Sequence, residues 1–169
     1  DILAITNTKL KIVEKADNYS IISATLKEID GILDKNAVLI LPILKEAKTI
    51  INPAPLDAYK KYKFTKDNVK YFIDDSERIL ELNKRGLELD FEIGSLIYSI
   101  MLRIRGLLMI KLILNNLLYS KSQLFSYLEH NGLTKDKIEE LYRIYSYERK
   151  GNKVKKSESI AKEDVQKLI

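Results

Sequence analysis

Apolar residues follow two different periods along the chain. Residues 2–5 and 19–23 form short apolar runs typical of buried strands, with about a dozen residues of weaker alternation between them. From Thr25 onward, apolar residues recur every three or four positions, as they do on one face of a helix. We therefore predict an α+β protein, in which a small N-terminal mixed sheet with helices is followed by a mainly α-helical bundle.

Capping residues mark the first predicted helices. Thr25 and Glu28 have the spacing of a capping box, in which the hydroxyl accepts from a free backbone amide and the carboxylate reaches back. The helix that they begin is expected to end at Asp34. Asn36 can begin a second helix, and Pro42 is expected to bend this helix or delay its start.

A break in the pattern divides the chain. Residues 49–51 are typical of a brief strand or an extended segment, and the sequence Asn-Pro-Ala-Pro at 52–55 interrupts regular structure. We place the domain boundary there, which gives one domain at residues 1–54 and a helical bundle at 55–169. Helices of the bundle are predicted at residues 65–85, 91–118, 120–132, 134–151 and 160–169.

One predicted helix could be mistaken for a membrane span. Residues 96–118 are mostly apolar and long enough to cross a bilayer. Arg103, Arg105 and Lys111 lie in the middle, however, and each would cost about 3 kcal/mol at the centre of a membrane. We therefore expect a buried helix of a soluble bundle and no membrane partner. A homodimer, in which a second copy covers the apolar stripe of this helix, is a further hypothesis.

Polar and small residues form a stripe along the same helix. At about 100° per residue, five of them fall within an arc of roughly 80°: Glu92, Ser95, Ser99, Arg103 and Gly106. The stripe indicates either a close helix crossing, with Arg103 paired to a carboxylate such as Glu92, or the lining of a polar site. In the second case the planar guanidinium of Arg103 would bind a phosphate.

The amino-acid composition excludes several kinds of catalytic and metal-binding site. The chain has 169 residues, of which 46% are apolar, so it can form a sizeable core. The absence of cysteine excludes disulfides, thiol nucleophiles and cysteine metal sites, and the single His130 excludes histidine-rich ones. The excess of lysine and isoleucine is typical of a thermophile or of an A/T-rich genome. No charged and apolar leader opens the chain, so we expect a cytoplasmic protein.

A net charge of +5 favours anionic partners, and one segment concentrates positive charge. Residues 149–156 hold five cations, which are Arg149, Lys150, Lys153, Lys155 and Lys156. Tyrosines recur nearby at 119, 142, 145 and 147, and aromatic and basic residues together can stack on bases and neutralise phosphates. Tyr142 and Tyr145 also lie on the apolar stripe of their helix, which instead predicts packing in the core. The basic segment is either a nucleic-acid contact or a solvated loop.

The order of these pieces carries a resemblance. Asp1-Ile2-Leu3-Ala4-Ile5 is similar to the second aspartate and strand of a Ser-Asp-x-Asp motif, and residues 19–29 to the strand and helix that follow it. Residues 44–51 are similar to the closing segment of that module, and residues 102–108, 119–121 and 141–145 to an appended bundle. The chain thus resembles archaeal members of the nucleotidyltransferase superfamily, which have a DNA polymerase beta-like fold. The family's Gly-Ser turn and first aspartate would precede Asp1.

The resemblance implies a chemistry. Such a protein would use Mg²⁺ and a nucleoside triphosphate, and would transfer a nucleoside monophosphate to a hydroxyl of RNA, a protein or a small molecule. Asp1 would be the catalytic residue and a metal ligand, and Asp17 a second metal ligand, while Arg103 and Lys111 would face the nucleotide. The alternative is a catalytically inactive module that binds RNA or a partner protein through the basic residues between 149 and 156.

Overall fold

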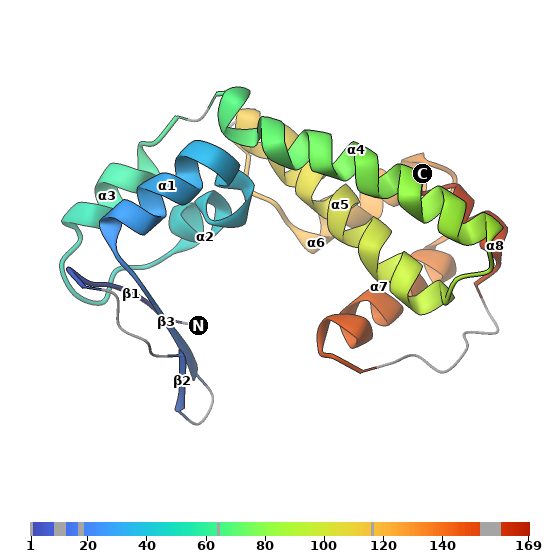
Figure 1. The fold of residues 1–169 in the computed structure, drawn as a ribbon, viewed down its shortest axis with the longest axis horizontal. Coiled ribbons are helices and arrows are strands. Elements are labelled where there is room, and N and C mark those ends of the chain that lie inside the picture. The colour runs from blue at the N-terminus through green and yellow to red at the C-terminus, as the bar shows by residue number, and fades with distance from the viewer. Residues whose placement is uncertain (1, 9–12, 17–18, 64, 116, 153–159) are drawn as a thin grey trace. The chain divides into compact units, whose positions relative to one another are not determined.

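The computed structural model describes residues 2–8, 13–16, 19–63, 65–115, 117–152 and 160–169. The chain divides into two compact units, residues 1–71 and 72–169, called unit 1 and unit 2 below. Strands and short helices make up most of unit 1, and unit 2 is helical (Figure 1). The predicted fold class, a small mixed sheet followed by a helical bundle, is confirmed.

The sheet of unit 1 has the strand order β1-β3-β2. Its strands are β1 (Ile2–Ile5), β2 (Val13–Ala16) and β3 (Tyr19–Ala24). Strand β3 runs parallel to β1 and antiparallel to β2, so the sheet is mixed. The strands β1 and β3 match the two predicted apolar runs. The sequence analysis did not assign β2, because its four residues, Val-Glu-Lys-Ala, alternate too weakly to stand out.

The helix α1 (Leu26–Asn36) begins with the predicted capping box. The backbone amide of Glu28 donates to Oγ1 of Thr25 at 3.2 Å, and the amide of Thr25 donates to the Glu28 carboxylate at 2.9 Å. A short 3₁₀ turn, η1 (Ala37–Leu39), follows and α2 (Leu41–Glu46) begins late, with Pro42 in its first turn. The predicted late start of this helix is confirmed. Proline is tolerated in a first turn because the amide hydrogen that it lacks would have no partner within the helix there.

Two details around residue 50 differ from the prediction. Residues 49–51 form no strand, and Ile50 and Ile51 are 78% and 86% exposed, so no neighbouring strand covers them. The helix α3 (Ala54–Lys60) begins within the Asn-Pro-Ala-Pro sequence, because its prolines occupy the helix start rather than the interior. The boundary predicted after residue 54 lies inside unit 1, where α3 packs against α2.

Unit 2 contains the predicted helical bundle. The helix α4 (Asp67–Glu88) begins in unit 1 and continues into unit 2, followed by α5 (Ile93–Leu114), α6 (Lys121–His130), α7 (Lys135–Arg149) and α8 (Lys162–Gln166). Apolar side chains of α5 to α8 form one core around residues such as Ile97, Ile100, Leu128 and Leu141, all at most 1% exposed. Helices α5 and α7 pack along each other at its centre (Figure 1).

Most apolar residues of α5 lie inside this core. They include Leu96, Ile100, Met101 and Ile104, which contact α6 to α8 rather than a second copy of the chain. In the part of the chain that is described, no helix combines the length and the apolar character needed to cross a membrane. Residues 96–114 therefore belong to a helix of a bundle, as predicted, but this helix ends at Leu114 rather than at Leu118, and Leu117 and Leu118 are exposed. The homodimer stays a prediction.

Candidate functional site

The polar stripe of α5 faces α4. An Nη atom of Arg103 donates to a carboxylate oxygen of Asp75 at 3.3 Å, and Nδ2 of Asn83 donates to Oγ of Ser99 at 2.9 Å. At Gly106 the two helices approach so closely that an added Cβ would lie 2.1 Å from the ring of Phe72. The stripe is thus a close helix crossing, one of its two predicted interpretations.

The predicted pairing of Arg103 with a carboxylate is confirmed, but the partner is Asp75 and not the example Glu92. Glu92 accepts a hydrogen bond from Ser95 within its own helix turn instead, and Asp75 of α4 pairs with Arg103. Sequence spacing favoured Glu92 because it lies on the same helix, whereas Asp75 comes near only through packing. Lys111 is exposed in the last turn of α5, and no contact brings it to Arg103. A nucleotide-binding role for Arg103 and Lys111 stays a prediction.

The structure does not describe the two residues that were expected to bind the metal. Asp1 and Asp17, the expected metal ligands, are outside the described residues, as are Lys153, Lys155 and Lys156 of the basic segment. No group of three or more histidine, aspartate or glutamate side chains that could hold a metal occurs within residues 2–8, 13–16, 19–63, 65–115, 117–152 and 160–169. The metal-binding roles therefore stay predictions.

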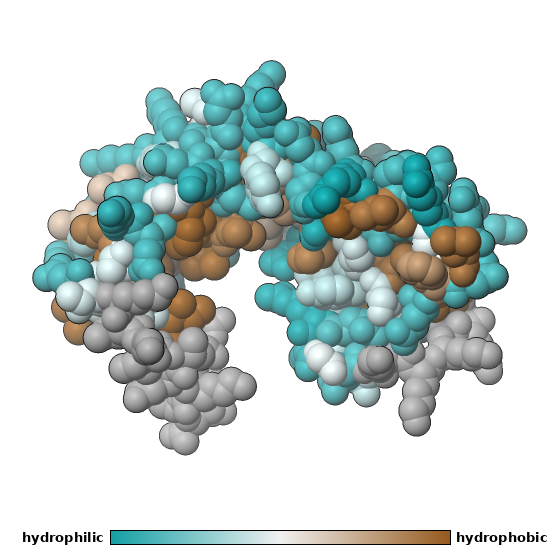
Figure 2. Space-filling view, viewed as in Figure 1, coloured by the Kyte–Doolittle hydropathy of each residue, from teal (hydrophilic) through white to brown (hydrophobic). Residues whose placement is uncertain are grey.

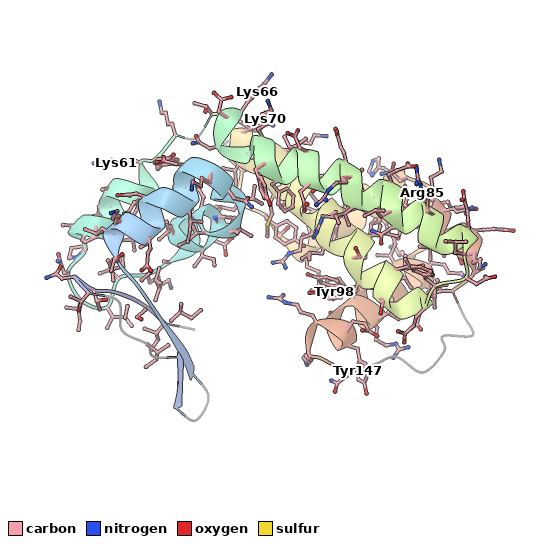
Figure 3. The ribbon with its side chains drawn as sticks, in the orientation of Figure 1. Lys61, Lys66, Lys70, Arg85, Tyr98 and Tyr147 are labelled. Carbon is pink, nitrogen blue, oxygen red and sulfur yellow. The ribbon has the colours of Figure 1, made fainter. Side chains whose placement is uncertain are left out.

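A second constellation lies on the side of α5 that faces α6 and α7. We call it the cation–tyrosine face, and it consists of Arg105, Tyr119, Lys121, Tyr142 and Tyr145. The helix α5 supplies the arginine, the chain before and at the start of α6 supplies Tyr119 and Lys121, and α7 supplies the other two tyrosines. Figure 3 labels Tyr98, a neighbour of this face, between α5 and α7.

Tyrosines hold the guanidinium of Arg105. Its Nη1 donates to the hydroxyl of Tyr145 at 3.1 Å, and its central carbon lies 5.3 Å from the ring centre of Tyr119. The Tyr145 ring is 2% exposed and stacks on Tyr98, with ring centres 5.7 Å apart. Tyr145 therefore positions Arg105 from the core, and Tyr119 contributes a further contact to the guanidinium.

Aromatic rings also surround Lys121. Its Nζ lies 4.3 Å from the ring centre of Tyr142 and 4.8 Å from that of Phe125. The two rings meet edge to face at 5.4 Å. Lys121 is the first residue of α6, where the helix dipole favours anions over cations, so the helix start gives this ammonium no support. The exposed Lys121 side chain therefore contacts ring faces rather than a carboxylate among the described residues.

Neither cation is neutralised. Within the described part of the chain, Arg105 and Lys121 form no ion pair with a carboxylate. Burial disfavours the charged form of Arg105, but its contacts with Tyr145 and Tyr119 outweigh this effect and raise its pKa. For Tyr119, burial is the largest effect that raises the pKa, and the Arg105 charge opposes this shift. The raised pKa favours a charged Arg105 beside the tyrosine hydroxyls. Together with Lys121, this arrangement is suited to an oxyanion such as phosphate.

The aromatic rings of this face are engaged with each other. Tyr145 is buried and contacts both Tyr98 and Tyr142, which confirms the prediction that Tyr145 packs in the core. Its ring therefore supplies no free surface for a nucleic-acid base. Arg149 lies one helical turn beyond Tyr145 and Lys150 caps the helix end, and both side chains are exposed. They are the first two cations of the predicted basic segment.

Sequence reasoning did not identify Arg105 and Lys121 as a pair. Arg105 was considered only as a charge in an apolar helix, and Lys121 only as part of a capping sequence. The contact from Arg105 to Tyr145 spans 40 positions, so no spacing rule reveals it. A comparison with protein-family models, curated proteins and solved structures finds no match to this chain.

Proposed function

We propose that the helical unit 2 binds RNA by its phosphate backbone through the cation–tyrosine face. The observation that carries this proposal is that Arg105 and Lys121 rest on aromatic rings with no carboxylate partner among the described residues. Lys137, by contrast, is paired with Asp164 at 2.7 Å. Two unpaired cations, fixed in position beside hydroxyls, are preorganised for an anion.

The extent of the positive charge favours a chain of phosphates over a single one. Arg149 and Lys150 lie at the end of α7, and neither forms an ion pair with a described residue. A backbone with regularly spaced phosphates could contact Arg105, Lys121 and these two residues together. Because the rings are packed against each other, binding would depend on phosphates and little on base identity.

The test measures binding of a fluorescent single-stranded RNA by anisotropy over a range of salt concentrations. The double variant Arg105→Gln with Lys121→Gln removes both cations and keeps polar side chains at each position. Because two phosphates would no longer be neutralised, the slope of log K against log salt should become shallower by about 1.4. Its matched control is Lys84→Gln with Arg85→Gln, which removes the same charge from the exposed surface of α4 (Figure 3).

The control decides between a site and a general charge effect. We expect the control variant to bind RNA almost as the wild type does. Equal weakening by the two double variants would show that only net charge matters, and would refute the assignment to the cation–tyrosine face. The absence of salt-dependent RNA binding by the wild-type chain would refute the proposed function itself.

We also propose, as a second candidate, nucleotidyl transfer with Mg²⁺ and a nucleoside triphosphate. What supports it is the order of elements, in which a mixed sheet with parallel β1 and β3 leads into α1 and then into a bundle, as the family resemblance implies. The test is thermal stability with each of ATP, GTP, CTP and UTP, with and without Mg²⁺. A metal-dependent rise that Asp1→Ala abolishes would support it, and no shift with any nucleotide would count against it.

A further inference from the structure

Unit 1 carries its own concentration of positive charge. Residues 60–63 and 65–70, called the lysine segment, contain Lys60, Lys61, Lys63, Lys66 and Lys70 and one carboxylate, Asp67. Its net charge of +4 compares with +5 for the whole chain. The basic segment at 149–156 carries the other excess, so the remainder of the chain is net negative. The lysine segment is therefore a local feature and not a sample of a uniformly basic protein.

The segment is anchored at both ends to α1. The hydroxyl of Tyr59, a residue only 8% exposed, donates to the carboxylate of Asp30 at 2.8 Å. At the other end, Nδ2 of Asn68 donates to the backbone carbonyl of Asp34 at 3.3 Å, and Val69 is 1% exposed. The two hydrogen bonds attach Tyr59 and Asn68 to α1, and the lysines of the segment lie beside these two residues in the sequence.

The charges of the five lysines are not paired with any described residue. All five are exposed, and none forms an ion pair or a side-chain hydrogen bond with a described residue. Hydrophilic side chains gather over the start of α4 in the space-filling view (Figure 2). Lys66 and Lys70 lie there, at the amino end of the helix, where positive charge is unfavourable to the helix dipole (Figure 3). Helix stability therefore does not account for them.

We propose that the lysine segment is a second phosphate-binding surface for nucleic acid, so that each unit contacts the same RNA. For its ligand this inference rests on the proposed function, but the residues that carry it are separate. Lysine is a compact cation that suits contact with backbone phosphates without reading sequence. Four net charges on one anchored stretch would attract a polyanion and would be screened strongly by salt.

The experiment uses the full chain and the same fluorescent RNA. The triple variant Lys61→Gln, Lys66→Gln and Lys70→Gln should weaken binding roughly tenfold at moderate salt and make the salt slope shallower by about 2. The control triple variant, Lys27→Gln, Lys35→Gln and Lys48→Gln, removes the same charge from other exposed positions of unit 1. We expect it to change affinity less than twofold.

Thermal stability separates binding from structure. If the lysines of α4 serve binding, replacing them should leave the melting temperature unchanged or raise it, because positive charge leaves the amino end of the helix. A lower melting temperature together with weaker binding would indicate a structural role and overturn the inference. Equal weakening by the control triple variant would also overturn it.

Two further outcomes distinguish this inference from the proposed function. If the lysine triple variant binds normally while Arg105→Gln with Lys121→Gln weakens binding, the lysine segment is not a contact and the cation–tyrosine face stands. If instead the lysine triple variant weakens binding and Arg105→Gln with Lys121→Gln does not, the lysine segment is supported as a contact and the assignment of binding to the cation–tyrosine face is refuted. If polyglutamate of equal charge competes as well as unlabelled RNA, the ligand is an acidic protein rather than a nucleic acid, which refutes the inference.

Discussion

Replacing Gly106 with alanine tests the close crossing of α4 and α5. The added Cβ would lie 2.1 Å from Cζ and 2.5 Å from Cε1 of Phe72. Ordinary contacts begin near 3.4 Å, so the ring and the helix would have to separate by about 1.3 Å. Gly31 of α1 is the matched control, because its added Cβ would meet no atom within 4 Å.

Two opposing effects determine how much Gly106→Ala changes the free energy of unfolding. Alanine is better than glycine in a helix interior by about 1 kcal/mol, which should appear undiminished for Gly31→Ala. Forcing an extra carbon into a packed contact costs about 1 to 3 kcal/mol. The partly buried Phe72 ring can move part of the way, so we expect Gly106→Ala to lower the free energy of unfolding by about 1 kcal/mol. The same substitution should thus have opposite signs in the two helices.

A double-mutant cycle identifies the clash. Urea unfolding followed by circular dichroism would be measured for Gly106→Ala in the wild-type and Phe72→Ala backgrounds. Without the ring, the substitution should stabilise by about 1 kcal/mol, which gives a coupling of about 2 kcal/mol between the two positions. If Gly106→Ala stabilises the protein equally in both backgrounds, then α4 and α5 do not approach as described. The assignment of the polar stripe to a helix crossing would then be wrong.

Three further predictions concern single contacts. Thr25→Ala removes the capping box of α1 and should cost about 1 kcal/mol in unfolding experiments; no loss would mean that the cap is not formed. Burial and the hydrogen bond to Asp30 raise the pKa of Tyr59 to about 12, so ultraviolet titration of Tyr59→Phe should lack one late-ionising phenol, and an unchanged curve would contradict the contact. The hydrogen bond from Lys137 lowers the pKa of Asp164. Its stabilising effect is therefore complete well above pH 4 and is lost as the pH falls through the lowered folded-state pKa. Asp164→Asn should be less stable than wild type at pH 7, with a gap that narrows in acid; a gap independent of pH would refute the ion pair.

Local signals in the sequence predicted most elements of the fold. The capping pair Thr25 and Glu28 and the cap of Ser120 on α6 depend on residues a few positions apart, so the sequence shows them directly. Glycine after α6, where Gly132 has a φ of +85°, likewise marks a helix end. The strand β2 was missed because a four-residue edge strand owes its existence to pairing with β3, and pairing is not a local property.

The candidate site depends on contacts that sequence spacing does not encode. Arg103 and Arg105 are two residues apart and therefore point to different sides of α5. One meets Asp75 of α4, a carboxylate that it shares with Arg78, while the other meets Tyr145 of α7 and has no ion pair among the described residues. The sequence alone favoured Arg103 as the functional arginine. Tertiary packing, which determines the carboxylate that each can reach, makes Arg105 the stronger candidate.

Cations at the starts of helices are paired with a carboxylate at some positions, whereas others, such as Lys27 of α1 and Lys135 of α7, have no ion pair among the described residues. Lys137 and Lys162 lie in the first turns of α7 and α8, where a cation is unfavourable, and each pairs with an aspartate that offsets the cost. Lys66 and Lys121 occupy equivalent places at α4 and α6 and have no such partner among the described residues. Each belongs to one of the two surfaces proposed to bind phosphate. An anionic ligand would supply at Lys66 and Lys121 the negative charge that the fold supplies at Lys137 and Lys162, so bound RNA should stabilise both units against unfolding.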